Sequence, residues 1–182
     1  MKTLVIVTHP NIHDSMVSKT WVHMLRQHPD RFTVHELYSE YPDGVIDVER
    51  EQALVEEHQN IVLQFPVYWF NCPPLLKKWC DEVLTYGWAY GSKGKAFENK
   101  KLGIAVSLGA PAPEYSAEGS VGYTVAETLR PFELTANYIS ADYQPLFAFH
   151  TIDTYESYDE AAAQQVTDSA DDYLAHLNTY YA

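Results

Sequence analysis

Histidine, asparagine and serine side chains gather around the start of a predicted helix at residues 16–27. This stretch contains His9, Ser15 and Ser18 but no Gly-x-Gly-x-x-Gly sequence, so the usual dinucleotide-binding fingerprint is absent. A helix start offers free N–H groups and the positive end of the helix dipole. The stretch therefore predicts a phosphate site, with the alternative that Asp14 or Ser15 only caps the helix.

Three consecutive aromatic residues, Tyr68, Trp69 and Phe70, follow a short apolar run at residues 61–65. The run ends at Pro66 and predicts a buried strand. Three neighbouring aromatic side chains cannot all face the core from a strand-to-helix connection, so we expect at least one to be presented at the carboxyl end of the sheet. Open α/β sheets bind their ligands at that end.

Alternating strands and helices are predicted to position these residues. The expected strands are residues 3–8, 31–37, 61–65, 102–107 and 142–149, and the expected helices are residues 16–27, 47–59, 125–135 and 158–178, with another helix beginning at Pro73 and Pro74. Such alternation favours a parallel sheet. Strand 31–37 is expected at an edge.

Two of the predicted helices carry further expectations. In helix 47–59, Val48, Ala53 and Leu54 are expected to face the core. In helix 125–135, Pro131 is expected to interrupt the helix, because proline is tolerated only at a start or a kink.

Composition limits the classes of function. The 182 residues carry a formal net charge of −13, which argues against nucleic acid and anionic membrane partners. We expect a single domain, residues 1–182, in the cytoplasm, because no run approaches a membrane span and no signal peptide is recognisable. Cys72 and Cys80 are expected to be free, structural thiols. The histidines do not cluster at ligand spacing, so no metal site is predicted, and no Gly-x-Ser-x-Gly elbow indicates a hydrolase.

The aromatic stretch belongs to a longer pattern. From Pro66 it is Pro-x-x-Trp-aromatic-x-x-Pro-x-x-Leu-Lys-x-Trp-x-Asp, followed later by Gly-Trp-Ala-Tyr-Gly. This pattern resembles the flavodoxin-like NAD(P)H:quinone oxidoreductase family, especially its short bacterial members, which include ancillary proteins of glutathione-gated potassium efflux systems. His9-Pro10, the segment 41–52 and the segment 107–110 support the resemblance, which extends to about His150.

The resemblance implies a fold, a cofactor and a reaction. The fold is a flavodoxin-like α/β three-layer sandwich with a five-stranded parallel sheet in the order 2-1-3-4-5. FMN is expected at the carboxyl ends of strands one, three and four, and FAD stays open. NAD(P)H would reduce the flavin by hydride transfer, leave, and be replaced by a quinone or a similar electrophile, which is a ping-pong reaction.

The resemblance also assigns cofactor contacts, residue by residue. The expected cofactor-binding residues are His9, Ser15, Met16, Val17, Ser18, Val67, Tyr68, Trp69, Phe70, Ser107, Leu108, Gly109 and Ala110. The backbone of 67–70 is expected to donate hydrogen bonds to the polar edge of the flavin, and Gly109 allows close approach to the ring. Leu108 and Ala110 depart from the Thr-Thr-Gly-Gly of the family, which leaves the backbone donors in place. The alternative for Trp69 and Phe70 is packing.

Three further aromatic residues are expected around the substrate. In the family, the loop of Trp88 and Tyr90 contributes to the substrate pocket and to a homodimer contact; the alternative is that both pack a loop. Tyr115 matches a tyrosine that manages charge on the flavin in animal-type relatives, and the alternative is a pocket wall. The family's histidine position falls on Val121, and no basic residue is expected nearby.

Two other classes of function stay open at this point. One is a regulatory subunit that contacts a potassium efflux system peripherally, with reductase activity secondary. The other is an electron-transfer flavodoxin, against which the aromatic loop argues, because such carriers show a hydroxyl- and glycine-rich phosphate loop instead.

Overall fold

Six parallel strands form one sheet in the computed structural model, which describes residues 2–150 and 159–182. The order is β2-β1-β3-β4-β5, and β6 also pairs with β4. The strands are β1 (Thr3–Val7), β2 (Phe32–Glu36), β3 (Asn60–Pro66), β4 (Lys101–Leu108), β5 (Asp142–Tyr143) and β6 (Phe147–His150). The predicted order 2-1-3-4-5 is confirmed, with β2 at an edge.

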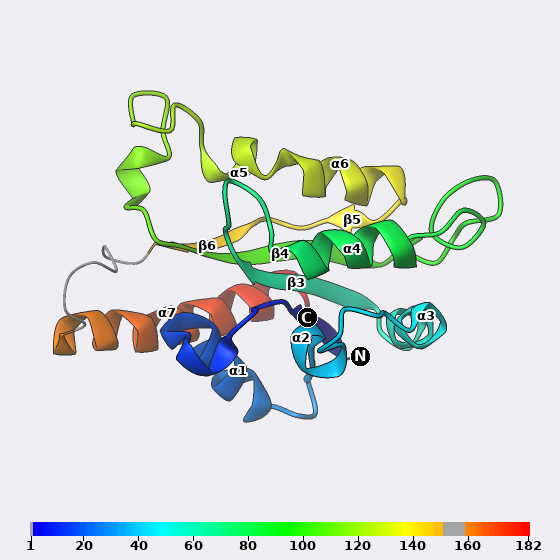
Figure 1. The fold of residues 1–182 in the computed structure, drawn as a ribbon, viewed down its shortest axis with the longest axis horizontal. Coiled ribbons are helices and arrows are strands. Elements are labelled where there is room, and N and C mark those ends of the chain that lie inside the picture. The colour runs from blue at the N-terminus through cyan, green and yellow to red at the C-terminus, as the bar shows by residue number, and fades with distance from the viewer. Residues whose placement is uncertain (1, 151–158) are drawn as a thin grey trace.

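Helices cover both faces of the sheet, so the predicted three layers are present. Figure 1 shows α1 and α7 on one side and α4, α5 and α6 on the other. The helices are α1 (Met16–Arg26), α2 (Leu37–Glu40), α3 (Val48–Glu56), α4 (Pro74–Val83), α5 (Val125–Thr128), α6 (Arg130–Tyr138) and α7 (Glu160–Tyr180), with 3-10 turns η1 (Ile12–Asp14) and η2 (Ala112–Glu114). None of the helices in the described part of the chain is long and apolar enough to cross a bilayer.

The central strand β1 is buried along its whole length. Its side chains alternate between two cores: Leu4 and Ile6 pack with α4 and α6, whereas Val5 and Val7 pack with α1 and α7. This explains the continuous apolar sequence, because a central parallel strand has no solvent face.

The predicted strand 142–149 lies in the sheet beside β4, as expected, but it is not continuous, because this segment forms two short strands. β5 and β6 both pair with β4 and are separated by residues 144–146. Pro145 lies in the gap, and proline has no N–H to give to a ladder. The interruption predicted at Pro131 is confirmed: α5 ends at Thr128, and Pro131 lies in the first turn of α6. The predicted start of the last helix at Tyr158 lies outside the described residues.

Cys72 and Cys80 are free, as predicted. Burial raises the pKa of Cys72 and raises that of Cys80 to about 12. Neither side chain is therefore a thiolate at neutral pH, which supports a packing role.

Helix α3 buries a carboxylate that the sequence pattern places outside. The helix is shorter than the expected 47–59, and Ala53 is exposed, while Glu51 and Val55 are buried. Glu51 and Val55 are four residues apart and so share one face. The expectation that Ala53 faces the core is therefore wrong.

Three buried donors surround the Glu51 carboxylate. The Tyr41 hydroxyl donates to Oε1 at 2.6 Å, His35 Nε2 lies 2.8 Å from the same oxygen, and Trp79 Nε1–H donates to Oε2 at 2.8 Å. Burial alone would raise the pKa of Glu51, but these hydrogen bonds outweigh it and hold the pKa below its ordinary value. The carboxylate thus ties together β2, the segment before α3, α3 and α4.

We expect Glu51→Gln to lower the free energy of unfolding by about 3 kcal/mol at neutral pH, because the neutral amide offers one acceptor oxygen to three buried donors. The lowered pKa means that the stabilisation is fully present above the ordinary carboxyl pKa and is lost as pH falls through the folded-state pKa. Urea unfolding at several pH values measures both effects.

Glu49→Gln is the matched control, because Glu49 is not buried and lies on the same helix. It should change stability by no more than about 0.5 kcal/mol. Equal losses in the two variants, or an acid dependence that Glu51→Gln leaves unchanged, would contradict the account.

Candidate active site

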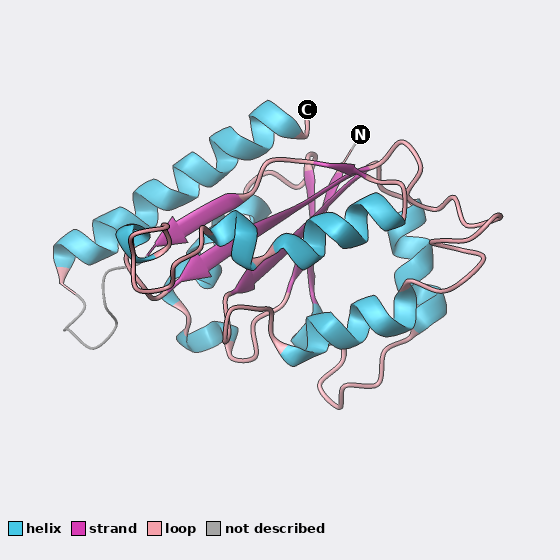
Figure 2. Ribbon diagram, turned by 90° about the horizontal axis from the view of Figure 1, so that it is seen from above, coloured by secondary structure: helices cyan, strands magenta, loops and turns pink. Residues whose placement is uncertain are grey.

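An open cleft lies where three neighbouring strands end. β1, β3 and β4 are adjacent and parallel, so the loops that follow them meet at one edge of the sheet. Figure 2 shows the strand arrows pointing toward the same end. The cleft has a volume of about 320 Å³ and is lined by Asp14, Ser15, Met16, Val17, Pro66, Val67, Tyr68, Ser107, Leu108 and Gly109.

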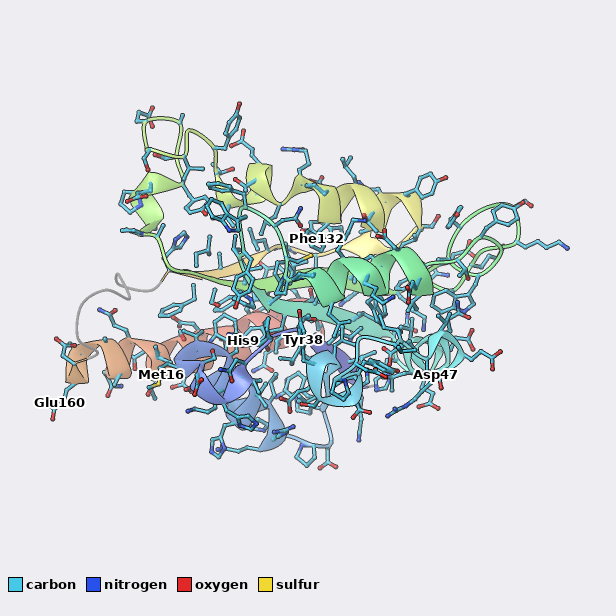
Figure 3. All side chains as sticks on the ribbon, in the orientation of Figure 1. His9, Met16, Tyr38, Asp47, Phe132 and Glu160 are labelled. Atoms are coloured by element: carbon cyan, nitrogen blue, oxygen red, sulfur yellow. The ribbon has the colours of Figure 1, made fainter. Side chains whose placement is uncertain are left out.

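His9 begins the first of these loops. Its Nδ1 accepts a hydrogen bond of 3.1 Å from the backbone N–H of Asn11, so in the neutral ring the proton resides on Nε2. Burial lowers the pKa of His9, with the Asn11 contact opposing it. His9 is therefore a neutral N–H donor at physiological pH. Figure 3 labels His9 and Met16 at the two ends of the connection from β1 to α1.

Ser15 caps helix α1, as the alternative interpretation of this stretch predicts. Its Oγ accepts a hydrogen bond of 3.0 Å from the Ser18 N–H. The N–H groups of Met16 and Val17 lie in the first turn of the helix, where they have no partner within the helix, and both residues line the cleft. Asp14, which precedes the cap, also lines the cleft, and its carboxylate accepts a hydrogen bond from the Asn11 side chain.

The aromatic residues form a strained two-residue turn. Tyr68 and Asn71 exchange backbone hydrogen bonds of 2.8 and 3.0 Å, and the central residues Trp69 and Phe70 have φ of 48° and 62°. Positive φ at both central positions is the pattern of a type I′ turn, which normally takes glycine or asparagine. The expected exposure is confirmed, because Trp69 is 93% exposed.

The same turn decides which backbone donors are free. Val67 N–H donates to the Ser107 carbonyl at 2.9 Å, and Tyr68 N–H is used within the turn. In the described part of the chain, the N–H groups of Trp69 and Phe70 have no acceptor. The expectation that all four residues donate to a ligand is therefore too broad, and two donors remain.

The third loop begins at the end of β4. Ser107, Leu108 and Gly109 line the cleft, and a side chain added at Gly109 would meet nothing within 4 Å, so the backbone is open there. Ala110 lies outside the lining.

Most of the expected cofactor-binding residues come together. Those in the lining are Ser15, Met16, Val17, Val67, Tyr68, Ser107, Leu108 and Gly109, and those outside it are His9, Ser18, Trp69, Phe70 and Ala110. The latter lie on the same three segments. Asp14 and Pro66 were missed as lining residues, although each is adjacent in sequence to an expected one.

Trp88 and Tyr90 do not reach this cleft. Their loop joins α4 to the start of β4, at the opposite end of the sheet, as the green loop in Figure 1 shows. The Trp88 indole donates to Glu56 at 2.7 Å, and the Tyr90 ring lies 5.4 Å from that of Tyr138. Within one chain, both side chains therefore pack against other residues at that end of the sheet.

Tyr115 has a basic neighbour, so the expectation of none is wrong. The centroids of the Tyr115 and His150 rings lie 5.8 Å apart. Burial raises the pKa of Tyr115, and the charge of Glu114 raises it further, so the phenol is neutral. Counting residues along the loop from Tyr115 reaches only Val121. His150 follows the end of the next predicted strand, and that position was the sequence signal that could have found it.

Comparison with known proteins agrees with this geometry. A model of the family described as flavodoxin-like fold matches residues 1–177. The crystal structure of general stress protein 14 from Treponema denticola in complex with FMN is 62% identical, covers 98% of this chain and 99% of that chain, and has a TM-score of 0.93. An NADPH-quinone reductase from P. pentosaceus is 33% identical, with coverages of 95% and 97% and a TM-score of 0.80.

A curated relative agrees with the resemblance to ancillary proteins of potassium efflux systems. The glutathione-regulated potassium-efflux system ancillary protein KefG of Erwinia tasmaniensis is 42% identical over 135 residues, which are 74% of this chain and 73% of that protein. The matched sequence, the strand order and the cleft at the carboxyl ends of β1, β3 and β4 agree with one another. The chain belongs to the flavodoxin-like fold family.

Proposed function

We propose that residues 1–182 act as a single cytoplasmic domain that binds FMN and transfers hydride equivalents from NAD(P)H to a quinone or a similar electrophile. The observation that carries this proposal is the convergence of three loops on one cleft at the carboxyl ends of β1, β3 and β4. The similarity to an FMN complex and to an NADPH-quinone reductase supports it.

The first loop fits a phosphate group. Met16 and Val17 offer N–H groups at the start of α1, Ser15 offers a hydroxyl, and His9 offers a neutral N–H. Backbone donors and the helix dipole favour an anion at this place. These residues would hold the phosphate end of FMN.

The other two loops fit the flavin ring. The free N–H groups of Trp69 and Phe70 suit the polar edge of the ring, and the open backbone at Gly109 suits its flat face. A polar group below the cleft also lacks a partner: the buried side-chain amide of Gln64 has no hydrogen bond within the described residues. Gln64 is two residues before Pro66 on β3 and so faces the same side of the sheet.

When bound, the flavin supplies the redox chemistry, taking a hydride from NAD(P)H and giving it to the acceptor in a separate, ping-pong step. The residues of the chain do the rest. The helix start and the turn orient the cofactor, and the exposed aromatic rings exclude water. The neutral hydroxyl of Tyr115 donates a hydrogen bond to the flavin or quinone oxygen as negative charge develops there.

The first test is cofactor uptake and reduction by NADH and NADPH. Met16→Pro should weaken FMN binding about 10- to 100-fold, because proline removes one N–H that would donate to a charged group but still suits the first helical position. Fluorescence titration measures the affinity. Glu160→Pro, at the first position of α7, is the control and should leave FMN affinity unchanged. Pure protein that takes up neither FMN nor FAD would overturn the proposal.

Tyr115→Phe should slow flavin reduction by about tenfold, near the effect of one lost neutral hydrogen bond. Stopped-flow absorbance with FMN-loaded protein measures this rate. We expect the backbone N–H donors of the turn, rather than the Tyr115 hydroxyl, to provide most of the stabilisation of the reduced flavin. A variant that keeps its flavin but is no longer reduced would show that the phenol does more than this.

We propose that the functional unit is a homodimer. Tyr86, Leu134 and Tyr138 are 73%, 60% and 71% exposed, and a groove of about 340 Å³ lies among Leu84, Tyr90, Leu134, Thr135, Tyr138 and Ile139. Apolar surface gathered in this way is typical of an interface. Because Trp88 and Tyr90 lie away from their own cleft, they can line a substrate pocket only across a subunit boundary.

Tyr138→Glu should shift the protein from dimer to monomer and abolish most quinone reduction while FMN stays bound, because a charge is placed at the interface. Analytical ultracentrifugation at micromolar concentration measures the change. Val45→Glu, at another exposed apolar position, should leave the dimer intact. A fully active wild-type monomer would refute the dimer.

The similarity to KefG favours a second candidate, an ancillary subunit that contacts a potassium efflux protein peripherally and has secondary reductase activity. Co-purification with such a transporter, together with slow reduction by both nicotinamides, would favour this role over the enzyme.

A further inference from the structure

A second hollow lies beside the turn that carries Trp69 and Phe70. Its volume is about 400 Å³, and it is lined by Phe70, Val121, Tyr123, Glu127 and Thr128. Phe70 comes from the connection between β3 and α4, and the other four residues come from α5 and the loop before it. Figure 1 shows this connection rising beside α5. Because Val67 and Tyr68 of the same connection line the cofactor cleft, one turn bounds both the cleft and the hollow.

Two aromatic side chains in the lining are open to solvent. Phe70 and Tyr123 are 51% and 63% exposed. Aromatic rings offer apolar surface to a flat ligand, and the negative face of a ring attracts a cation. The two rings therefore favour a planar aromatic occupant and add a preference for positive charge.

Glu127 is the charged member of the lining. The Thr124 N–H and the Thr124 hydroxyl donate hydrogen bonds of 2.8 and 2.7 Å to its Oε2. These two hydrogen bonds, the backbone one first, hold the pKa of Glu127 below its ordinary value. Among the described residues, no group donates a hydrogen bond to Oε1. The hollow thus holds an ionised carboxylate that keeps one oxygen for a ligand.

The neighbouring charges do not cancel this carboxylate. Arg130 on α6 also lowers the pKa of Glu127, but its guanidinium lies 3.6 Å from the carboxylate of Glu133. Glu114 adds a second negative group on the loop before α5, where its carbonyl accepts a hydrogen bond of 3.1 Å from the Val121 N–H. The chain as a whole carries a formal charge of −13, which attracts cations and disfavours the approach of anions.

We propose that this hollow is an acceptor subsite that selects planar organic cations over anions of similar size. The inference rests on the proposed function. An aromatic cation such as a phenothiazinium takes the hydride that the proposed reaction supplies and becomes a neutral molecule, so both electrons and the single hydrogen are accounted for. A neutral quinone that takes the same hydride becomes an anion and needs a proton from water. Glu127 attracts the cation and repels the anion, so the charge of the acceptor affects its rate as well as its shape does.

Binding is measured first, without turnover. Isothermal titration calorimetry uses oxidised, FMN-loaded protein and methylene blue, which is a phenothiazinium cation. We expect Glu127→Gln to weaken methylene blue binding about 3- to 10-fold at low salt, because the carboxylate is lost. Glutamine can keep the capping box with Thr124, so the helix start is preserved.

Glu118→Gln is the matched control. Glu118 is exposed on the loop between β4 and α5 but lies outside the lining, so this change removes the same charge from the chain without touching the hollow. It should alter methylene blue binding by less than about twofold. Tyr123→Leu, which removes one ring from the lining, should weaken binding about threefold.

Turnover is then compared with methylene blue and with dichlorophenolindophenol, an anionic dye that also takes two electrons. The ratio of kcat/KM for the cation to kcat/KM for the anion should fall about tenfold in Glu127→Gln. Salt at about 0.5 M should reduce this difference, because it screens exposed charges.

Equal methylene blue affinity in wild type and Glu127→Gln, or an equal loss in Glu118→Gln, would overturn this inference alone. The same holds for a protein that a nicotinamide reduces but whose preference between the two dyes is unchanged in Glu127→Gln. A protein that binds methylene blue as expected but that neither nicotinamide reduces would overturn the proposed function and, with it, the acceptor role of the hollow.

Discussion

Parallel pairing of β1, β3 and β4 is the constraint on which the site depends. Neighbouring parallel strands end at the same edge, so their connections must leave there and return by helices. Each connection satisfies a different local rule. After β1 a helix begins at a serine cap, after β3 a tight turn reverses the chain, and after β4 a glycine keeps the backbone open. The cleft lies between these three connections.

Of the three connections, the turn at Trp69 and Phe70 has the most strained backbone. Positive φ in a bulky residue costs on the order of 1–3 kcal/mol, so the surroundings must enforce it. Below the turn, the Val67 to Ser107 hydrogen bond joins its first arm to β4. Beyond it, α4 is anchored through Trp79 to the buried carboxylate of Glu51. These two hydrogen bonds fix the segments before and after the turn, and among the described residues the N–H groups of Trp69 and Phe70 have no acceptor.

The two ends of the sheet carry different groups of aromatic residues. One end carries the cleft, Tyr115 and His150, and the other carries Trp88, Tyr90 and the exposed rings around Tyr138. Rigid strands separate the two ends, so no side-chain rotation can bring Trp88 to its own cleft. Under the proposed function, Trp88 and Tyr90 would therefore contribute to a substrate pocket only across a boundary between two chains.

Local sequence determined where β1, β3 and β4 lie, the helix starts at Met16 and Val125, and the three segments around the cleft, whereas the strand order was implied by the resemblance to a family. Apolar runs, proline positions and the serine before α1 are short-range signals, and each predicted what the backbone does there. Glu51, Trp88 and His150 were decided by tertiary structure. A carboxylate is buried only where donors from other elements meet it, as Tyr41, His35 and Trp79 do. Likewise, His150 neighbours Tyr115 only because Pro145 divides the last strand and β6 pairs with β4, a long-range register that no spacing along the chain records.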